Sequence, residues 1–242
     1  MESEALALLC DPDTRYSFEL DGQTLRNTAT GRVYPIRDGI PLFISSLTGA
    51  NLRLQSRYDR MARFYDLGER LNRWMGKSPD FRAELAAALE LAPGARVLEV
   101  AVGTGANIPY LPQTIDLYGI DISWPMLIRC RRKLRKSGRS VRLFHGEAAR
   151  LPFCSSAFDC VFAACVLGAL PEPARAVTEM VWVTRPGGRI VIADRFSPAG
   201  NNGQDAAPVF PMDLVPEGME NVQARTIGEG QLYCLSFSKP LD

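Results

Sequence analysis

Paired cysteines and histidines, which most protein metal sites need, are nearly absent from this chain of 242 residues. The six cysteines stand at positions 10, 130, 154, 160, 165 and 234 with no Cys-x-x-Cys pair among them, and His145 is the only histidine. This scatter argues against a thiolate-bound metal centre and against a regular disulfide framework. It indicates reduced thiols in a cytoplasmic protein.

An excess of charge and a long apolar run are missing as well. The 28 basic residues nearly balance the 27 acidic ones, so no global field favours a nucleic-acid partner. The chain has no apolar run of about 18 residues that predicts a membrane span, and its acidic start lacks the basic residues of a signal peptide. The basic run 129–139 is interpreted as a solvated helix face, with RNA or a phospholipid head group as the alternative ligand.

From residue 96 onward, short apolar runs alternate with longer amphipathic segments, which predicts an α/β fold with a doubly wound, mostly parallel, Rossmann-like sheet. Residues 49–90 before this region are expected to be helical. Strands are expected near 96–101, 117–121, 141–145, 159–164 and 189–194, and helices near 106–111, 124–137 and 173–184. The tail predicts a hairpin of strands near 222–227 and 231–237 after a shortened or missing helix. That loss predicts a pocket that is more open, or that depends on a second copy or another protein partner.

A glycine-rich turn follows the first of these strands. The apolar run 97–102 predicts a strand covered on both faces, and Gly103 and Gly105 permit positive φ and a close approach of a ligand. Asp121 ends the second strand, where a carboxylate can accept hydrogen bonds from both hydroxyls of a ribose. The alternative role of Asp121 is to cap a helix that begins near Ser123.

Two features of this turn argue against a nicotinamide or flavin dinucleotide. Ile108 occupies the place of the third glycine in Gly-x-Gly-x-x-Gly. Glu99 puts a carboxylate just before the turn, where it would repel a pyrophosphate and attract an ammonium group. S-adenosylmethionine carries an ammonium and no phosphate, so the turn favours this cofactor.

Six segments in order resemble the class I S-adenosylmethionine-dependent methyltransferases, in the branch that is similar to the ubiquinone and menaquinone C-methyltransferases. The resemblance covers residues from about 55 to 195 and is carried by the segments 58–66, 99–105, 119–123 with Met126, 146–153, 158–159 and 185–189. It implies that one group of side chains and loop residues binds the cofactor: Tyr58, Tyr65, Glu99, Ala101, Gly103, Thr104, Gly105, Asp121, Ile122, Met126, Gly146, Glu147, Ala148, Ala164 and Cys165.

Residues 1–48 resemble the small zinc-ribbon-like domain that is often fused before such methyltransferases, through the run Tyr34-Pro-Ile-Arg-Asp-Gly-Ile-Pro41. The two knuckle positions read Cys10-Asp-Pro-Asp13 and Asn27-Thr-Ala-Thr30, so only one thiol remains. We therefore predict a metal-free ribbon domain over 1–48 and a cofactor-binding domain over 49–242. The expected ribbon core consists of Leu20, Ile36, Ile40 and Phe43.

Three side chains are candidates for the chemistry. His145 could be a general base, or could support the adenine pocket from the end of a strand. Cys165 follows the fourth strand, where a nucleophile or a small packing residue would stand. Arg195 could hold an anionic substrate or make a surface ion pair. Enzymes that methylate amino groups of nucleic-acid bases carry an Asn/Asp-Pro-Pro-Tyr motif after the fourth strand, and this motif is absent around Cys165.

The sequence therefore predicts a methyltransferase that acts on a small apolar or aromatic metabolite, as in secondary metabolism. For methyl transfer from a sulfonium, the enzyme mainly positions the acceptor beside the methyl group and excludes water. The alternatives are a biosynthetic cyclase or rearrangement enzyme that keeps the cofactor, an RNA methyltransferase, and a non-catalytic partner-binding protein.

Overall fold

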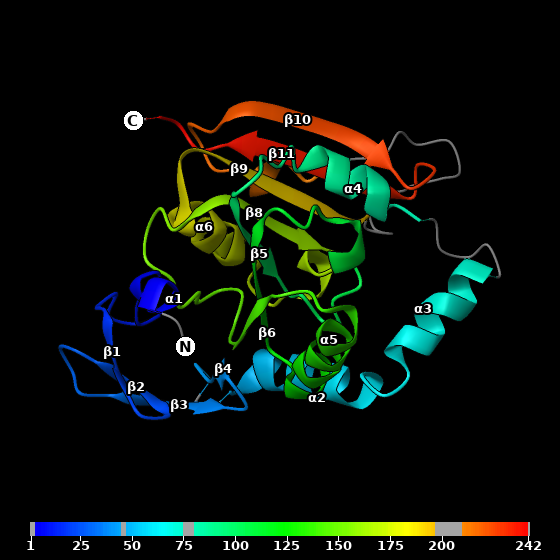
Figure 1. The fold of residues 1–242 in the computed structure, drawn as a ribbon. Coiled ribbons are helices and arrows are strands. Elements are labelled where there is room, and N and C mark those ends of the chain that lie inside the picture. Colours follow the sequence, from blue (N-terminus) through cyan, green and yellow to red (C-terminus); the bar gives the residue numbers. More distant parts are fainter. Residues whose placement is uncertain (1–2, 45–46, 75–79, 197–209, 242) are drawn as a thin grey trace.

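A seven-stranded sheet forms the centre of the computed structural model, which describes residues 3–44, 47–74, 80–196 and 210–241 (Figure 1). The strand order is β10-β11-β9-β8-β5-β6-β7. All pairs among the last five strands are parallel, whereas β11 is antiparallel to both of its neighbours. This architecture confirms the predicted doubly wound α/β sheet. The strands are β5 (Arg96–Val100), β6 (Asp116–Asp121), β7 (Arg142–His145), β8 (Phe158–Ala164), β9 (Thr184–Arg195), β10 (Glu220–Ile227) and β11 (Leu232–Ser238).

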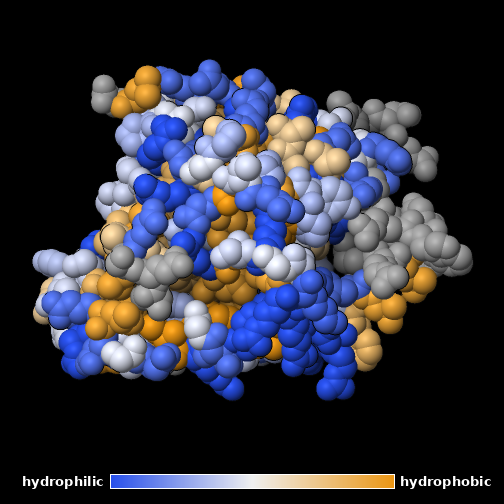
Figure 2. Space-filling model, viewed as in Figure 1, coloured by the Kyte–Doolittle hydropathy of each residue, from blue (hydrophilic) through white to orange (hydrophobic). Residues whose placement is uncertain are grey.

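Helices cover both faces of this sheet. Helices α4 (Arg82–Ala88) and α5 (Trp124–Ser137) pack on one face through Leu85, Leu127 and Cys130. Helix α6 (Pro173–Val183) packs on the other face. Helix α5 has the predicted bounds because Ser123 caps its first turn and Gly138, at φ 69°, ends it. Hydrophilic residues cover its outer face (Figure 2).

The expected helical region 49–90 forms three helices. Helices α2 (Gly49–Met61) and α3 (Tyr65–Trp74) precede α4, and α2 lies beside α5 (Figure 1). Asp66 anchors the start of α3, because its Oδ1 accepts hydrogen bonds from Thr104 Oγ1 and Lys133 Nζ, each at 2.6 Å. These contacts hold α3 against the loop after β5.

Two expected elements differ in the structure. The prediction of a helix over 106–111 is wrong, because only the short 3-10 helix η1 (Ile108–Tyr110) forms there. Leu111 precedes Pro112 and takes an extended conformation, which stops the helix. The fifth strand is longer than the expected 189–194. Its Gly187 and Gly188 exchange hydrogen bonds with Lys239 instead of forming a turn before the strand.

The N-terminal residues form a separate four-stranded antiparallel sheet, here called the ribbon. It consists of β1 (Phe18–Asp21), β2 (Thr24–Asn27), β3 (Val33–Arg37) and β4 (Ile40–Pro41), after the short helix α1 (Ser3–Ala7). Just after β4, a parallel bridge joins Leu42 to His145 at the end of β7. The ribbon thus continues the edge of the large sheet.

The ribbon core differs from the expected one. Phe43 is buried as expected, but Leu20 is 41% exposed because it lies beyond the packed rings, close to the β1–β2 turn. Aromatic rings fill the core instead: Phe18, Tyr34 and Phe43 pack with ring centroids 5.4–5.7 Å apart. These rings belong to the same cluster as the residues under α6. The division of the chain at residue 48 stays a prediction.

A disulfide corrects the expectation that all six cysteines are reduced. Cys10 and Cys154 form a disulfide across a sequence separation of 144 residues, with their Cα atoms 4.9 Å apart. Hydrogen bonds from Cys10 N to Pro152 O and from Cys154 N to Leu8 O run beside it. No sequence pattern indicated this pair, because only the docking of the ribbon brings the two thiols together.

The C-terminal hairpin of β10 and β11 is confirmed. The predicted loss of a helix before it falls mostly on residues 197–209, which lie outside the described residues; residues 212–214 form the short 3-10 helix η4 (Met212–Leu214). No helix in the described part of the chain is long and apolar enough to cross a membrane.

Reduction of the Cys10–Cys154 disulfide should lower the free energy of unfolding by about 2–4 kcal/mol, because the bond closes a long loop in the unfolded chain. Urea denaturation with and without dithiothreitol measures this loss. The double variant Cys10→Ala, Cys154→Ala should already show the lower stability and should not respond to the reductant. An equal response of the variant and the parent protein would contradict the prediction.

Candidate cofactor site

The carboxyl ends of β5, β6, β7 and β8 meet at one edge of the sheet because these strands are parallel. The turn after β5 alternates in conformation, with φ of +59° at Ala101, +54° at Gly103 and +74° at Gly105. A Cβ at Gly105 would lie 2.7 Å from Cys130 Sγ and 2.8 Å from Ile108 Cδ1. Glycine is therefore required at this position for both its conformation and its size.

Asp121 faces this turn from the end of β6. Its Oδ2 accepts a hydrogen bond from Gly103 N at 2.8 Å, and its Oδ1 accepts one from Ser123 N at 2.8 Å. Burial raises the pKa of Asp121 to about 6, although these hydrogen bonds act in the opposite direction. The alternative that Asp121 itself caps the helix is wrong, because Ser123 is the cap of α5 and its Oγ accepts from Met126 N. Asp121 instead binds the N–H of that capping residue, so one carboxylate braces both the glycine turn and the residue before α5.

Glu99 lies one residue before the end of β5 and is 1% exposed. Its Oε1 accepts a hydrogen bond from Asn107 Nδ2 at 2.7 Å, whereas its Oε2 has no hydrogen-bond partner among the described residues. Burial raises the pKa of Glu99 to about 8, and the nearby Arg82 guanidinium lowers it. A buried acceptor without a donor is costly, which favours a ligand that supplies the donor.

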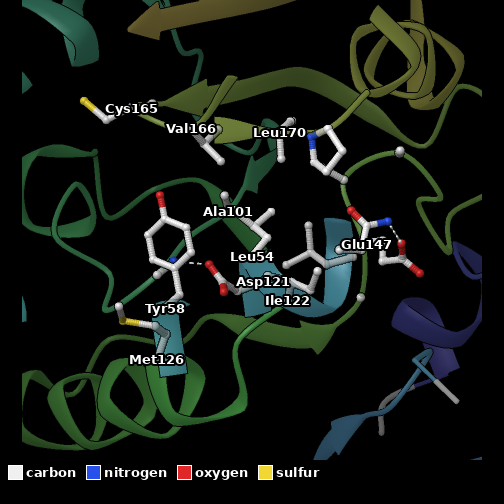
Figure 3. A pocket seen from close by; sticks show the side chains of 18 of the residues that line it. Leu54, Tyr58, Ala101, Asp121, Ile122, Met126, Glu147, Cys165, Val166 and Leu170 are labelled. Atoms are coloured by element: carbon white, nitrogen blue, oxygen red, sulfur yellow. Dashed lines mark hydrogen bonds between the residues drawn. The ribbon is translucent and has the colours of Figure 1, made fainter. Parts of the chain in front are cut away.

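A cleft opens beside these carboxylates, and its lining includes most of the predicted site residues (Figure 3). In Figure 3, Tyr58 from α2 extends between Met126 and Cys165, and Asp121 lies between Tyr58 and Glu147. The predicted residues that line the cleft are Tyr58, Tyr65, Ala101, Gly103, Asp121, Ile122, Met126, Gly146, Glu147, Ala148, Ala164 and Cys165.

A second hollow adjoins the cleft, and both are lined by Tyr65, Ala101, Gly103, Ala164 and Cys165. Its other lining residues include three predicted ones, Glu99, Thr104 and Arg195. Gly105 lines neither space and acts through the shape of the turn. The two hollows together extend from Glu147 to Glu99, past the glycine turn.

Glu147 lies at the far end of the cleft. Its Oε2 accepts a hydrogen bond from Asn51 Nδ2 at 2.7 Å, and its Oε1 lies 3.6 Å from Arg150 Nη1. Burial raises the pKa of this carboxyl group. The apolar Ile122 and Ala148 line the wall nearby. This end therefore combines a flat apolar surface with one oriented acceptor.

The three candidate catalytic side chains lie in different places relative to the two hollows. His145 lies in the wall of the fold and lines neither hollow: it is 8% exposed, its Nε2 is 2.9 Å from Ile122 O, and its ring packs edge-on against Trp124. Burial lowers its pKa. Cys165 lines both hollows at φ +54°. Arg195 is exposed and reaches only the second hollow.

Two lining residues of the cleft and two of the second hollow were not predicted from the sequence. Leu54 lies one turn and Asn51 two turns before Tyr58 on α2, so helical spacing alone places all three on one face. Arg82 and Asn107 line the second hollow beside Glu99. No sequence signal identified this pair, because Arg82 precedes the sheet and meets Glu99 only through the packing of α4.

Residues 98–192 match the sequence profile of a family that is described as a methyltransferase domain. This segment contains the glycine turn, Asp121 and Glu147. This part of the chain is therefore similar to a methyltransferase domain. The match agrees with S-adenosylmethionine, the cofactor that the glycine turn favours.

Relatives outside the profile agree with this assignment of a methyltransferase domain. The chain is 36% identical over 132 residues to a phosphatidylethanolamine N-methyltransferase of Cereibacter sphaeroides, which covers 54% of this chain and 62% of that protein. It is also 36% identical over 126 residues to a demethylmenaquinone methyltransferase of Renibacterium salmoninarum, which covers 51% of each. The chain thus spans only about half to three fifths of these relatives.

The methyltransferase fold extends beyond the region of clear sequence similarity. Phosphoethanolamine N-methyltransferase 2 of Haemonchus contortus, solved with S-adenosyl-L-methionine, superposes with a TM-score of 0.63 at 14% identity. The match covers 83% of this chain and 62% of that chain. At this identity the likeness concerns the fold alone.

Gly105→Ala should destabilise the methyltransferase domain by about 3 kcal/mol, because the new Cβ adds a clash with Cys130 and Ile108 to the strain of positive φ. Gly138→Ala is the matched control: it has φ +69° but open space around its Cβ, so the strain alone should cost about 1 kcal/mol. Urea denaturation compares the two. Equal losses would refute the clash.

Proposed function

We propose that this protein binds S-adenosylmethionine along the two hollows and transfers its methyl group to a small acceptor molecule. The observation that carries the proposal is the position of two buried carboxylates, Asp121 and Glu99, on either side of the glycine turn. A ribose offers two hydroxyl donors and an amino acid offers an ammonium donor. The cofactor has both, because its ribose is joined through the sulfur to an amino-acid chain.

The cleft would hold the adenosine part. Asp121 is placed to accept hydrogen bonds from the ribose hydroxyls, because its two oxygens are already oriented by backbone N–H groups. Glu147 is placed to accept one from the adenine amino group. The other predicted residues that line the cleft would contact the ring, the sugar and the sulfur by van der Waals packing.

The second hollow would hold the amino-acid part. Glu99 Oε2 is buried and lacks a donor, which an ammonium group would supply. The Arg82 guanidinium lines the same hollow and could bind the carboxylate. Thr104 donates its hydroxyl to Asp66, so its role is to hold α3 over this hollow.

The sulfonium of the cofactor supplies the electrophile. The residues of this chain would then position the acceptor in line with it and exclude water. Tyr58, Tyr65 and Cys165 come from three different segments and line the cleft, and Tyr65 and Cys165 also line the second hollow. His145 serves as a brace in this proposal, since its Nε2 is paired with Ile122 O.

The acceptor would be apolar or aromatic on the side that faces the cleft. The apolar residues Leu54, Val166, Leu170 and Pro171 also line the cleft. The relatives are named for a phospholipid and a quinone precursor, which both have large apolar parts. A carbon, nitrogen or sulfur nucleophile, or an acidic hydroxyl, could react there without a dedicated base.

The expected cytoplasmic location and a partner chain at the C-terminal region stay predictions. The Cys10–Cys154 disulfide stands against the first, because disulfides are rare in reducing compartments. For the second, the described tail ends in the hairpin of β10 and β11, and β10 is exposed along most of its length.

S-adenosylhomocysteine should bind with micromolar affinity, and Asp121→Ala should weaken binding at least tenfold through the loss of the ribose hydrogen bonds. Calorimetry measures both. Asp116→Ala is the matched control, because Asp116 is the first residue of the same strand and pairs with Arg142. Absence of binding to the folded parent protein would refute the proposed function.

Binding at pH 7 should release close to one proton, because Glu99, with its pKa raised to about 8, is mostly protonated until an ammonium group pairs with it. Affinity should accordingly rise between pH 6.5 and 7.5, below the range in which the amino group of the ligand loses its proton. The dependence of the calorimetric enthalpy on the ionisation enthalpy of the buffer measures the release. Glu99→Gln should bind more weakly and release no proton; release that persists in this variant would show that another group titrates.

A further inference from the structure

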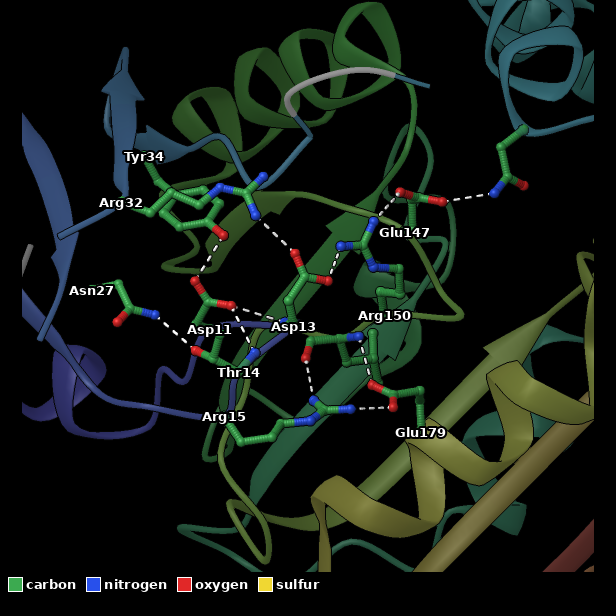
Figure 4. A network of polar contacts seen from close by, with 12 residues as sticks. Asp11, Asp13, Thr14, Arg15, Asn27, Arg32, Tyr34, Glu147, Arg150 and Glu179 are labelled. Atoms are coloured by element: carbon green, nitrogen blue, oxygen red, sulfur yellow. Dashed lines mark hydrogen bonds and ion pairs between the residues drawn. The ribbon is translucent and has the colours of Figure 1, made fainter. Parts of the chain in front are cut away.

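A chain of polar contacts runs from the ribbon to the far end of the cleft (Figure 4). Asp13 accepts a hydrogen bond from Arg32 Nη1 at 2.8 Å and forms a short ion pair with Arg150. Arg150 lies next to Glu147, and Glu147 accepts the hydrogen bond of Asn51. Arg150 therefore connects Asp13 of the ribbon to Glu147, which lines the cleft.

The ribbon holds Asp13 in a fixed place. Asp11 is 1% exposed, and its Oδ1 accepts hydrogen bonds from Asp13 N at 2.8 Å and Thr14 N at 3.0 Å. Its Oδ2 accepts a third from Tyr34 OH at 2.8 Å. A buried acceptor with three donors makes a rigid turn. Asp13 takes part in this turn only through its backbone N–H, so its carboxylate can bind Arg32 and Arg150.

The loop that carries Glu147 and Arg150 is braced by the same part of the ribbon. Residues 146–157 contain no helix, and the segment 146–154 lies against residues 8–15. The Cys10–Cys154 disulfide and the bridge between Leu9 and Phe153 join the two segments. Arg15 adds a hydrogen bond to Leu151 O.

The guanidinium of Arg150 lies between two carboxylates, those of Asp13 and Glu147. Asp13 holds Nη2, whereas Nη1 stays 3.6 Å from Glu147 Oε1, beyond hydrogen-bond length. Glu147 Oε1 thus keeps its capacity to accept another donor. Without the charge of Asp13, the guanidinium would close on Glu147, the remaining carboxylate, and would occupy that oxygen.

We propose that Asp13 is a positioning residue of the cofactor site, through which the ribbon sets the selectivity of the cleft for a 6-amino purine. Asp13 draws Arg150 away from Glu147, and Glu147 then accepts the hydrogen bond of the adenine amino group. This inference rests on the proposed function, because it takes the cofactor's adenine as the ligand of Glu147.

The test uses the whole chain and two ligands, S-adenosylhomocysteine and S-inosylhomocysteine. The second carries a carbonyl oxygen in place of the amino group, so it cannot donate to Glu147 at that position. The parent protein should prefer the adenosyl compound by about tenfold or more, as expected for a hydrogen bond to a charged group. Asp13→Asn preserves shape and the backbone turn but removes the charge, and should reduce the preference to about twofold.

Two further variants locate the effect. Glu147→Gln should abolish the preference, and the double variant Asp13→Asn, Glu147→Gln should lose no more than Glu147→Gln alone, because the two residues act through one contact. Asp21→Asn is the matched control: it removes the same charge from an exposed ion pair with Arg26 in the ribbon, which has no link to the cleft. Its preference should equal that of the parent protein.

Each outcome decides one claim. Failure of the parent protein to bind either ligand would refute the proposed function. If the parent protein binds, and Glu147→Gln removes the preference while Asp13→Asn leaves it intact, the positioning role of Asp13 is refuted. A parallel loss of affinity for both ligands in Asp13→Asn, with their ratio unchanged, would also refute it, since that result indicates general support of the loop.

Discussion

The parallel pairing of β5 with β6 is the interaction on which the cleft depends. Its register puts Glu99 opposite Gly119 and Val100 opposite Ile120, so Asp121 extends just beyond the last pair and meets the glycine turn. A shift of one residue would turn the side chains of β6 to the other face of the sheet. Gly119 supports this register, because a Cβ there would lie 3.0 Å from the side chain of Val102.

The same pairing buries two carboxylates close to each other, and the charge of Asp121 raises the pKa of Glu99 further. In the protein alone this arrangement is unfavourable, since desolvation disfavours the charged form of both groups. A ligand that brings donors to both ends of the turn relieves the cost. The cleft is therefore organised for its ligand at the expense of its own stability.

Side-chain hydrogen bonds hold the backbone of the ribbon at its two predicted knuckle positions. At one predicted knuckle Asp11 accepts from two backbone N–H groups, and at the other Asn27 Oδ1 accepts from Ala29 N and Thr30 N, each at 2.9 Å. Such Asx turns fix the local backbone at both positions. The disulfide, the aromatic core and the Asp13–Arg150 pair then fasten the ribbon to the large sheet.

The sequence by itself determined the sheet, the glycine turn, the bounds of α5 and the carboxylates that face the cleft. Each of these depends on local patterns: apolar alternation, caps and glycines that allow positive φ. Only the tertiary structure decided that Cys10 meets Cys154, that Arg82 lines the hollow beside Glu99, and that Asp13 reaches Arg150. It also showed that His145 braces the wall and does not line the cleft. These contacts join segments separated by 17 to 144 residues, and their geometry follows from how whole elements pack, which no local pattern encodes.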